Sequence, residues 1–204
     1  MASRLRLSLA PPGRAWLALA ALLAAGSVLA GGLPAWALDW QPALAASEPW
    51  RAWSAAFVHW STLHLRANLG AIAAVAAFGW AARVPPRAAL AWFAAWPLTH
   101  LGLWLRPELA HYGGLSGLLH GGVAVVVLWL LVGARGGRRA VGAMVGAGLL
   151  AKLWLEQPWG PVLRDAADWD IAVAPLAHAT GAVAGVLCGA LMLAVGTRGG
   201  ESGP

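Results

Sequence analysis

Residues 115–132 read LSGLLHGGVAVVVLWLLV, a run without a charged side chain. Crossing about 30 Å of hydrocarbon takes roughly 20 apolar residues in a helix, so this stretch is long enough to span a membrane. Five further apolar stretches accompany it, and none of the six contains Asp or Glu. We therefore expect an all-α membrane protein with six transmembrane helices, at about Ala15–Ala37, Ala56–Trp80, Ala88–Leu105, Leu115–Val132, Ala140–Leu155 and Ile171–Val195.

The composition of the 204-residue chain agrees with this expectation. Hydrophobic residues make up 60% of the chain and charged residues 11%, whereas a soluble domain carries about 25% charged residues. This balance excludes an ordinary soluble enzyme, a disordered chain and a fibrous protein. The sequence contains no soluble domain, linker or repeat, and we predict a single domain over residues 1–204. The lone cysteine, Cys188, excludes a disulfide framework within the chain.

The placement of charge predicts the orientation in the membrane. The formal net charge is +6, and basic loops stay in the cytoplasm. With six crossings, one side holds most of the basic residues: Arg4, Arg6, Arg14, Arg83, Arg87, Arg135, Arg138, Arg139 and Arg198. The other side holds seven of the eight acids, in loops that we expect to be extracytoplasmic: Asp39, Glu48, Glu108, Glu156, Asp165, Asp168 and Asp170. We expect both termini in the cytoplasm, the acidic loops on the extracytoplasmic side, and no nucleic-acid partner.

The first apolar stretch has a second interpretation. It follows basic residues and ends in Ala35-Trp36-Ala37, which resembles the cleavage site of a secretory signal peptide. Its apolar run is longer than the 7–15 residues usual for such a peptide. We therefore expect a retained first helix, with cleavage as the alternative.

Three polar motifs lie inside the apolar stretches, where polar side chains are costly and are functional candidates. The orientation places all three near the extracytoplasmic ends of their helices, which predicts one shared site. Glycines four residues apart let membrane helices approach closely, so the fourth and sixth helices should be neighbours. The motifs are His59-Trp-Ser-Thr-Leu-His64-Leu-Arg-Ala-Asn68, Tyr112-Gly-Gly-Leu-Ser116-Gly-Leu-Leu-His120-Gly-Gly122 and His178-Ala-Thr-Gly181-Ala-Val-Ala-Gly185-Val-Leu-Cys-Gly189.

Ser116 beside His178 is the minimum for nucleophilic acyl transfer, because imidazole can take the hydroxyl proton and return it to the leaving amine. No carboxylate is expected at this depth, so the sequence predicts a Ser/His dyad without an acidic third member. The oxyanion of the intermediate needs hydrogen-bond donors. His64 and Asn68 share a helix face, about 40° apart, and with the backbone N–H of Ser116 they are candidate donors. At its spacing from His64, His59 should face elsewhere.

At about residues 50–189 the chain resembles the rhomboid family of intramembrane serine proteases. The resemblance rests on Trp50-Arg51, on the spacing of His59, His64 and Asn68, on Gly114-Leu115-Ser116-Gly117, and on His178-x-x-Gly181-x-x-x-Gly185. It implies a six-helix fold and a serine endopeptidase with a Ser116/His178 dyad. The compact size and the motif around Ser116 are most similar to the rhombosortase branch, which is associated with bacterial proteins that carry C-terminal Gly-Gly-containing sorting tails. This resemblance implies a location in the inner membrane of a bacterium.

The resemblance also implies supporting roles. His64 and Asn68 match positions on the oxyanion side, with Gly114 and Gly117 flanking the serine. Residues assigned to the architecture of the site are His59, His120, Trp50, Arg51, Gly181 and Gly185. Of these, His120 departs from many rhomboids, in which an aromatic residue often packs against the catalytic histidine. Trp50-Arg51 matches a loop in the lipid interface. The substrates implied are single-pass or C-terminally tailed membrane proteins, and membrane lipid is the other partner.

Three alternatives compete with a protease. The first is a non-catalytic rhomboid-like protein that binds membrane helices. The second is a small transporter or channel, which the scarcity of buried charge disfavours. The third is a metal or haem site at the intramembrane histidines, disfavoured because no acidic or thiolate companion is expected at that depth. We predict no metal and no cofactor. His100 and His111 are expected to be interfacial or solvated.

Overall fold

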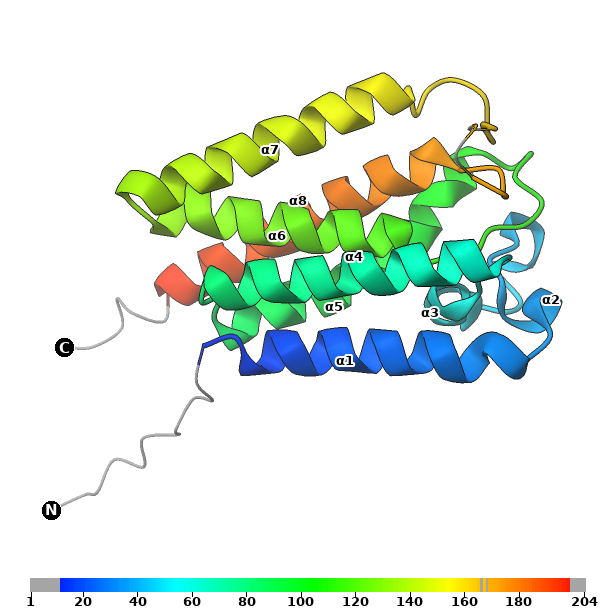
Figure 1. Ribbon diagram of the computed structural model, residues 1–204, viewed down its shortest axis with the longest axis horizontal. Helices are drawn as coiled ribbons and strands as arrows, with labels where there is room; N and C mark the ends of the chain where they lie inside the picture. Colours follow the sequence, from blue (N-terminus) through cyan, green and yellow to red (C-terminus); the bar gives the residue numbers. More distant parts are fainter. Residues whose placement is uncertain (1–11, 166, 168, 199–204) are drawn as a thin grey trace, which may run out of the picture.

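The computed structural model describes residues 12–165, 167 and 169–198. Within these ranges the chain is helical, with no β-strand beyond two isolated bridges, Trp40 with Tyr112 and Arg164 with Val173. The long helices are α1 (Arg14–Leu29), α4 (Thr62–Ala81), α5 (Pro86–Leu101), α6 (Ser116–Gly133), α7 (Gly136–Glu156) and α8 (Pro175–Arg198). They run side by side along the long axis of the molecule (Figure 1).

Shorter helical turns lie at one end of this bundle, and tight connections between long helices lie at the other end (Figure 1). Two are short α-helices, α2 (Ala35–Leu38) and α3 (Arg51–Ser54). Four are 3₁₀ turns: η1 (Ala30–Gly32), η2 (Pro42–Leu44), η3 (Ala55–Phe57) and η4 (Gly102–Leu105).

Four segments of the described chain are long and apolar enough to cross a membrane: Arg14–Gly32, Pro86–Leu105, Ser116–Gly133 and Pro175–Val195. These helices make the chain a membrane protein by length and composition. The other two long helices, α4 and α7, are more polar. Helix α4 contains Arg66 and the polar site residues, and α7 contains Arg138, Arg139 and Lys152.

Two predicted stretches are broken in the structure. The first, expected to continue to Ala37, stops as an α-helix at Leu29 and resumes as α2 after Pro34, because glycine and proline do not continue a helix. The second was expected from Ala56, but α4 begins at Thr62. Ser61 caps it, and its hydroxyl accepts a hydrogen bond from the His64 N–H at 3.0 Å.

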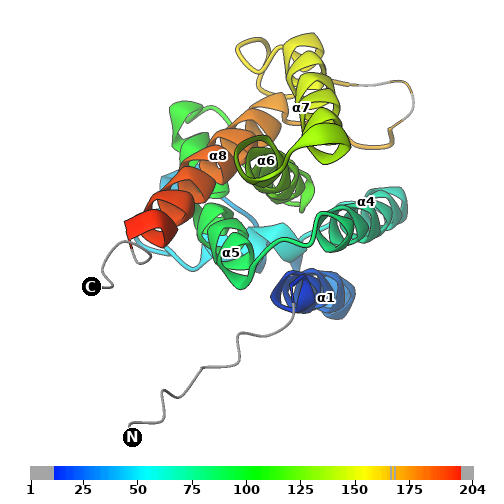
Figure 2. The same ribbon diagram turned by 90° about the vertical axis from the view of Figure 1, so that its left-hand side faces the viewer.

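Helix α6 forms the centre of the bundle and contacts α4, α5, α7 and α8 (Figure 2). Its closest partner is α8, as the glycine spacing predicts. A Cβ atom built on Gly181 would lie 1.9 Å from the carbonyl oxygen of Gly117, and one on Gly185 would lie 2.3 Å from that of Gly121. The two backbones therefore touch, and these positions accept no side chain without movement.

The glycine stripe is shorter than the sequence suggests. Gly113 precedes α6 and packs against Val58, not against α8. Gly189 faces side chains of α6, with Leu128 nearest, and makes no backbone contact. The backbone contact is thus confined to the half of the two helices that lies next to Ser116 and His178.

Helix α7 is packed far more loosely. Gly142 is its one buried residue, against Leu130 of α6. Figure 2 shows α7 at the edge of the bundle, beside α6. Most of its apolar side chains are exposed, Trp154 and Leu155 among them.

The segment between α1 and α4 is fixed by a buried ion-pair cluster. The Arg51 guanidinium contacts the carboxylates of Asp39, at 3.2 Å, and Glu48, at 2.6 Å. Asp39 is completely buried, and its second carboxylate oxygen meets His111. Burying an unpaired charge costs free energy, and the pairing of these groups offsets that cost. Arg51 therefore holds the segment together, whereas the neighbouring Trp50 is 53% exposed.

The expectation for His100 is wrong. This side chain is completely buried between α5 and the α3 region, where its Nδ1 lies 2.6 Å from the carbonyl oxygen of Ala52. Its ring lies beside those of Trp40 and Tyr112. His100 is thus part of the smaller of two hydrophobic cores, the one beneath the short helices. His111 is exposed, in agreement with the prediction.

Candidate active site

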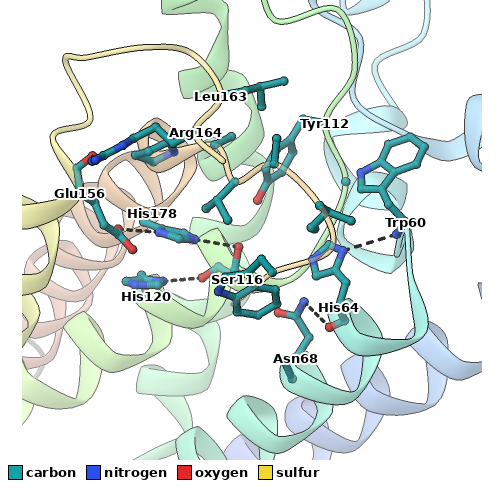
Figure 3. A pocket seen from close by; sticks show the side chains of 18 of the residues that line it. Trp60, His64, Asn68, Tyr112, Ser116, His120, Glu156, Leu163, Arg164 and His178 are labelled. Atoms are coloured by element: carbon teal, nitrogen blue, oxygen red, sulfur yellow. Dashed lines mark hydrogen bonds and ion pairs between the residues drawn. The ribbon is translucent and has the colours of Figure 1, made fainter. Parts of the chain in front are cut away.

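A pocket of about 400 Å³ opens where α4, α6 and α8 begin and α7 ends. Its lining brings together the three polar motifs, which are far apart in the sequence (Figure 3). The residues that line it include Trp60, His64, Asn68, Tyr112, Ser116, His120, Lys152, Glu156, Arg164 and His178.

Ser116 and His178 face each other across the contact between α6 and α8. The Ser116 Oγ lies 3.0 Å from the His178 Nε2, within hydrogen-bond distance. Ser116 is the first residue of α6 and His178 lies in the first turn of α8. Just below them, Gly117 and Gly181 touch, so the backbone contact sets how closely the two side chains approach.

His120 lies one turn after Ser116 and stacks on His178. The two imidazole centroids are 4.2 Å apart and their planes differ by 13°. The His120 Nδ1 lies 2.6 Å from the carbonyl oxygen of Ser116, so its N–H donates back into its own helix. This fixes the ring as a flat surface against which the His178 imidazole is held.

A carboxylate also reaches the site, contrary to the sequence expectation. Glu156, the last residue of α7, places its Oε2 2.7 Å from the His178 Nδ1 (Figure 3). Its other oxygen pairs with Lys152, one turn earlier on the same helix. The sequence assigned Glu156 to an extracytoplasmic loop. Helix α7 instead continues to Glu156, and the fold brings its end beside the first turn of α8.

His64 and Asn68 line the opposite wall, on α4. The His64 Nδ1 accepts a hydrogen bond from the Trp60 N–H at 3.4 Å, so the ring proton lies on Nε2. The Asn68 amide donates to the His64 carbonyl oxygen at 3.1 Å. Both side chains are buried at the pocket and present N–H groups toward the turn that leads to Ser116.

Gly114 explains how these side chains reach that turn. Its φ is +127°, a conformation that favours glycine. A Cβ atom there would lie 2.7 Å from the His64 Nε2 and 4.0 Å from the Asn68 amide nitrogen. The Gly114 N–H donates to the Ala55 carbonyl oxygen at 2.9 Å. Gly114 is therefore a close-approach position and its own N–H is already used.

The remaining predicted residues surround the site. His59 lies outside the pocket lining, with its ring centroid 4.8 Å from that of His64, and burial lowers its pKa from the ordinary value. It supports the His64 ring. Trp50 and Arg51 lie in the segment that carries the ion-pair cluster, and Gly185 lies in the α6–α8 contact.

Besides Glu156, sequence reasoning missed the roles of four pocket residues: Tyr112, Trp60, Lys152 and Arg164. Tyr112 is buried, and its hydroxyl has no hydrogen-bond partner among the described residues. Trp60 fixes the His64 ring through its backbone. Lys152 pairs with Glu156, and the Arg164 guanidinium donates to the Glu156 carbonyl oxygen at 2.8 Å. Tyr112 and Trp60 stood within the quoted motifs but were given no role, whereas nothing in the sequence indicated Lys152 and Arg164.

His120, Glu156 and His178 form a group that could hold a metal ion, with ligand atoms within 4.8 Å of one another. The premise that no acidic companion reaches the histidines is therefore wrong. Both nitrogens of His178 already have partners, Ser116 and Glu156. A cation would have to displace at least one of these contacts, so the donor set as it stands suits proton transfer better than metal binding.

A helical membrane protein with a serine hydroxyl, an imidazole and candidate oxyanion donors around one pocket has the parts of a serine hydrolase. The model of the rhomboid domain family matches residues 46–195. The chain therefore belongs to the rhomboid family, which implies an intramembrane serine protease. A search of curated proteins gives no match.

Proposed function

We propose that this protein is an endopeptidase that cleaves membrane-anchored substrates with Ser116 as nucleophile and His178 as general base and acid. The observation that carries the proposal is the 3.0 Å contact between the Ser116 Oγ and the His178 Nε2, within a pocket of about 400 Å³. That distance suits transfer of the hydroxyl proton to the imidazole as the oxygen attacks.

The reaction proceeds in two balanced steps. The Ser116 oxygen attacks the scissile carbonyl carbon while its proton passes to the His178 Nε2. The carbon–nitrogen bond then breaks, and the amine leaves with that proton. His178 then takes a proton from water as the water oxygen attacks the resulting ester, and returns that proton to the Ser116 oxygen as the ester bond breaks and the carboxylate product leaves.

The oxyanion formed during attack needs donors already in place. We assign this role to the His64 Nε2–H and the Asn68 amide, because both lie close to the turn that precedes Ser116. The Ser116 N–H is a third donor, since the first N–H groups of a helix have no acceptor within it. The positive end of the α6 dipole adds to the stabilisation.

The arrangement of the helices supports the expected orientation. Helix α1 begins, and α8 ends, at the end of the bundle opposite the pocket (Figure 1). The α4–α5 and α6–α7 connections, with Arg83 and Arg135, lie at that same end. We propose that this basic end faces the cytoplasm, that all six long helices cross the membrane, and that the pocket opens toward the extracytoplasmic face. Arg4 and Arg6 lie outside the described residues.

Substrates are proposed to be transmembrane or C-terminal tail segments, with Gly-Gly-containing sorting tails of the rhombosortase type as the leading candidates. A helix hides its carbonyl groups in hydrogen bonds, so a scissile bond must lie where the helix unwinds. Glycines weaken a helix locally and leave room for close approach to Ser116. A non-catalytic protein that binds membrane helices is the alternative.

The test is cleavage, in liposomes, of a tagged membrane segment with a Gly-Gly tail. The wild-type protein should cleave it, whereas Ser116→Ala and His178→Ala should lose at least about 10³-fold in rate. A fluorophosphonate probe should label Ser116 and no other residue. Cleavage that persists in Ser116→Ala contradicts the nucleophile assignment. Binding of the segment without cleavage by the wild-type protein favours the non-catalytic alternative.

Activity should also survive removal of metal ions. If the reaction is Ser/His chemistry, dialysis against a chelator leaves the rate unchanged. Loss of activity on chelation, with recovery on adding Zn²⁺, would assign the chemistry to the His120, Glu156 and His178 group instead.

A further inference from the structure

The acidic residue beside His178 has no role in a two-residue mechanism. Glu156 places its Oε2 2.7 Å from the His178 Nδ1, on the side of the ring opposite to Ser116. The order Ser116 Oγ, His178 Nε2, His178 Nδ1 and Glu156 Oε2 forms one continuous chain of hydrogen bonds (Figure 3). This is the order that orients an imidazole for nucleophilic catalysis.

We propose that Glu156 is a positioning residue that makes the site a Ser–His–Glu triad; this inference rests on the proposed function. By accepting the Nδ1–H of His178, the carboxylate leaves the Nε2 lone pair free for the Ser116 proton. When His178 becomes an imidazolium during attack, the negative charge of Glu156 stabilises it. Glu156 itself touches neither the substrate nor the reacting atoms.

The location of Glu156 favours a functional role over a purely structural one. It is the last residue of α7, where the negative end of the helix dipole disfavours a carboxylate. An exposed Glu–Lys pair at the surface contributes little to stability, so pairing with Lys152 alone gives weak reason to hold it there. The contact with His178, whose side chain is 7% exposed, is the one that crosses from helix α7 to helix α8.

Two basic residues hold Glu156 in place. Lys152 pairs with the Oε1, which leaves the Oε2 for His178. Arg164 donates to the Glu156 carbonyl oxygen at 2.8 Å and ties the end of α7 to the segment that leads toward α8. The residue after Glu156, Gln157, has a φ of +50° and ends the helix. The backbone of Glu156 is therefore fixed by Arg164, and its carboxylate is fixed by Lys152.

The test measures kcat and KM of Glu156→Gln on the tagged tail substrate, together with the rate at which the fluorophosphonate labels Ser116. Gln keeps the size of the side chain but removes its charge. We expect kcat and the labelling rate to fall roughly 10²–10⁴-fold, while KM changes less than about threefold. Glu108→Gln is the matched control, since Glu108 pairs with Arg106 outside the pocket. It should behave as the wild type.

A second variant separates the contact of Glu156 with His178 from its ion pair with Lys152. Lys152→Met removes the cation but keeps Glu156, and we expect a loss in kcat of less than about tenfold. Rates are measured on protein that elutes as a folded species, so poor folding of Glu156→Gln does not imitate the effect. A Glu156→Gln variant within threefold of wild-type kcat overturns the triad. So does a larger loss in Lys152→Met than in Glu156→Gln, because Lys152 would then matter apart from its contact with Glu156.

The same assay keeps the two proposals apart. Comparison of the wild-type protein with Ser116→Ala reports on the proposed function. Comparison of Glu156→Gln with the wild-type protein reports on the triad. A protein that needs Ser116 but not Glu156 is a protease with a dyad, and only the further inference fails.

Discussion

Helices α6 and α7 leave from the same tight connection but are held in opposite ways. Helix α6 is the most buried of the four apolar spans and touches α8 backbone to backbone through Gly117 and Gly121. Helix α7 has one buried residue, Gly142. Yet each supplies a member of the hydrogen-bond chain, Ser116 from α6 and Glu156 from α7. The contact that needs the finest geometry lies on the rigid pair, and the charge that orients it lies on the loosely packed helix.

The largest expected effect comes from breaking the rigid pair. In Gly181→Val, a Cβ atom would lie 1.9 Å from the Gly117 carbonyl oxygen, and backbone cannot yield as a flexible side chain can. We expect the free energy of unfolding to fall by about 3 kcal/mol or more, with loss of Ser116 labelling. Thermal unfolding in detergent checks the first and the fluorophosphonate probe the second. The control is Gly148→Val on α7, where a Cβ atom meets nothing within 4 Å.

A smaller effect is expected where α7 packs on α6. In Gly142→Val, the new Cβ atom would lie 2.7 Å from the Leu130 Cβ. Because nothing else on α7 is buried, the helix can move outward, and we expect the free energy of unfolding to fall by only about 1–2 kcal/mol. The rate of cleavage should fall more than stability implies, since Glu156 moves with the helix. If the cleavage rate of Gly142→Val falls only as much as its loss of stability explains, the proposed contrast between α6 and α7 is wrong.

The smallest effect concerns the ring that stacks on His178. A stacked aromatic pair contributes about 0.5–1.5 kcal/mol beyond burial, so His120→Ala should lower kcat roughly 2- to 13-fold. His120→Phe keeps a flat ring at the same place and should remain within about threefold of the wild type. If both variants lose activity equally, the imidazole nitrogens of His120 matter and the stacking argument is wrong.

Sequence reasoning predicted the features of the fold and of the site that follow from local sequence patterns. Hydrophobic runs located the long helices to within a few residues at most ends. Glycine spacing predicted that α6 and α8 are neighbours, and hence that Ser116 meets His178. His64 and Asn68 were predicted together because four residues on a helix return to one face.

The parts it missed depend on how helix ends meet in space. Glu156 was assigned to a loop because its stretch of hydrophobicity stops at Leu155, and hydrophobicity does not report where a helix ends. Nothing in the spacing indicated that this end lies beside His178. His100 was placed at the surface for a similar reason, since a lone histidine near a loop gives no sign of the core that Trp40 and Tyr112 form around it.

The glycine contacts also limit how far the two helices can slide along each other. The contacting glycines are four residues apart on both helices, so Gly117 faces Gly181 and Gly121 faces Gly185 in one register. Bringing Gly121 opposite Gly181 would take a slide of α8 by four residues, about 6 Å along the helix axis, and would place Gly117 and Gly185 opposite larger residues. The close backbone contact therefore restricts sliding of α8 along α6, and with it changes in the separation of Ser116 from His178.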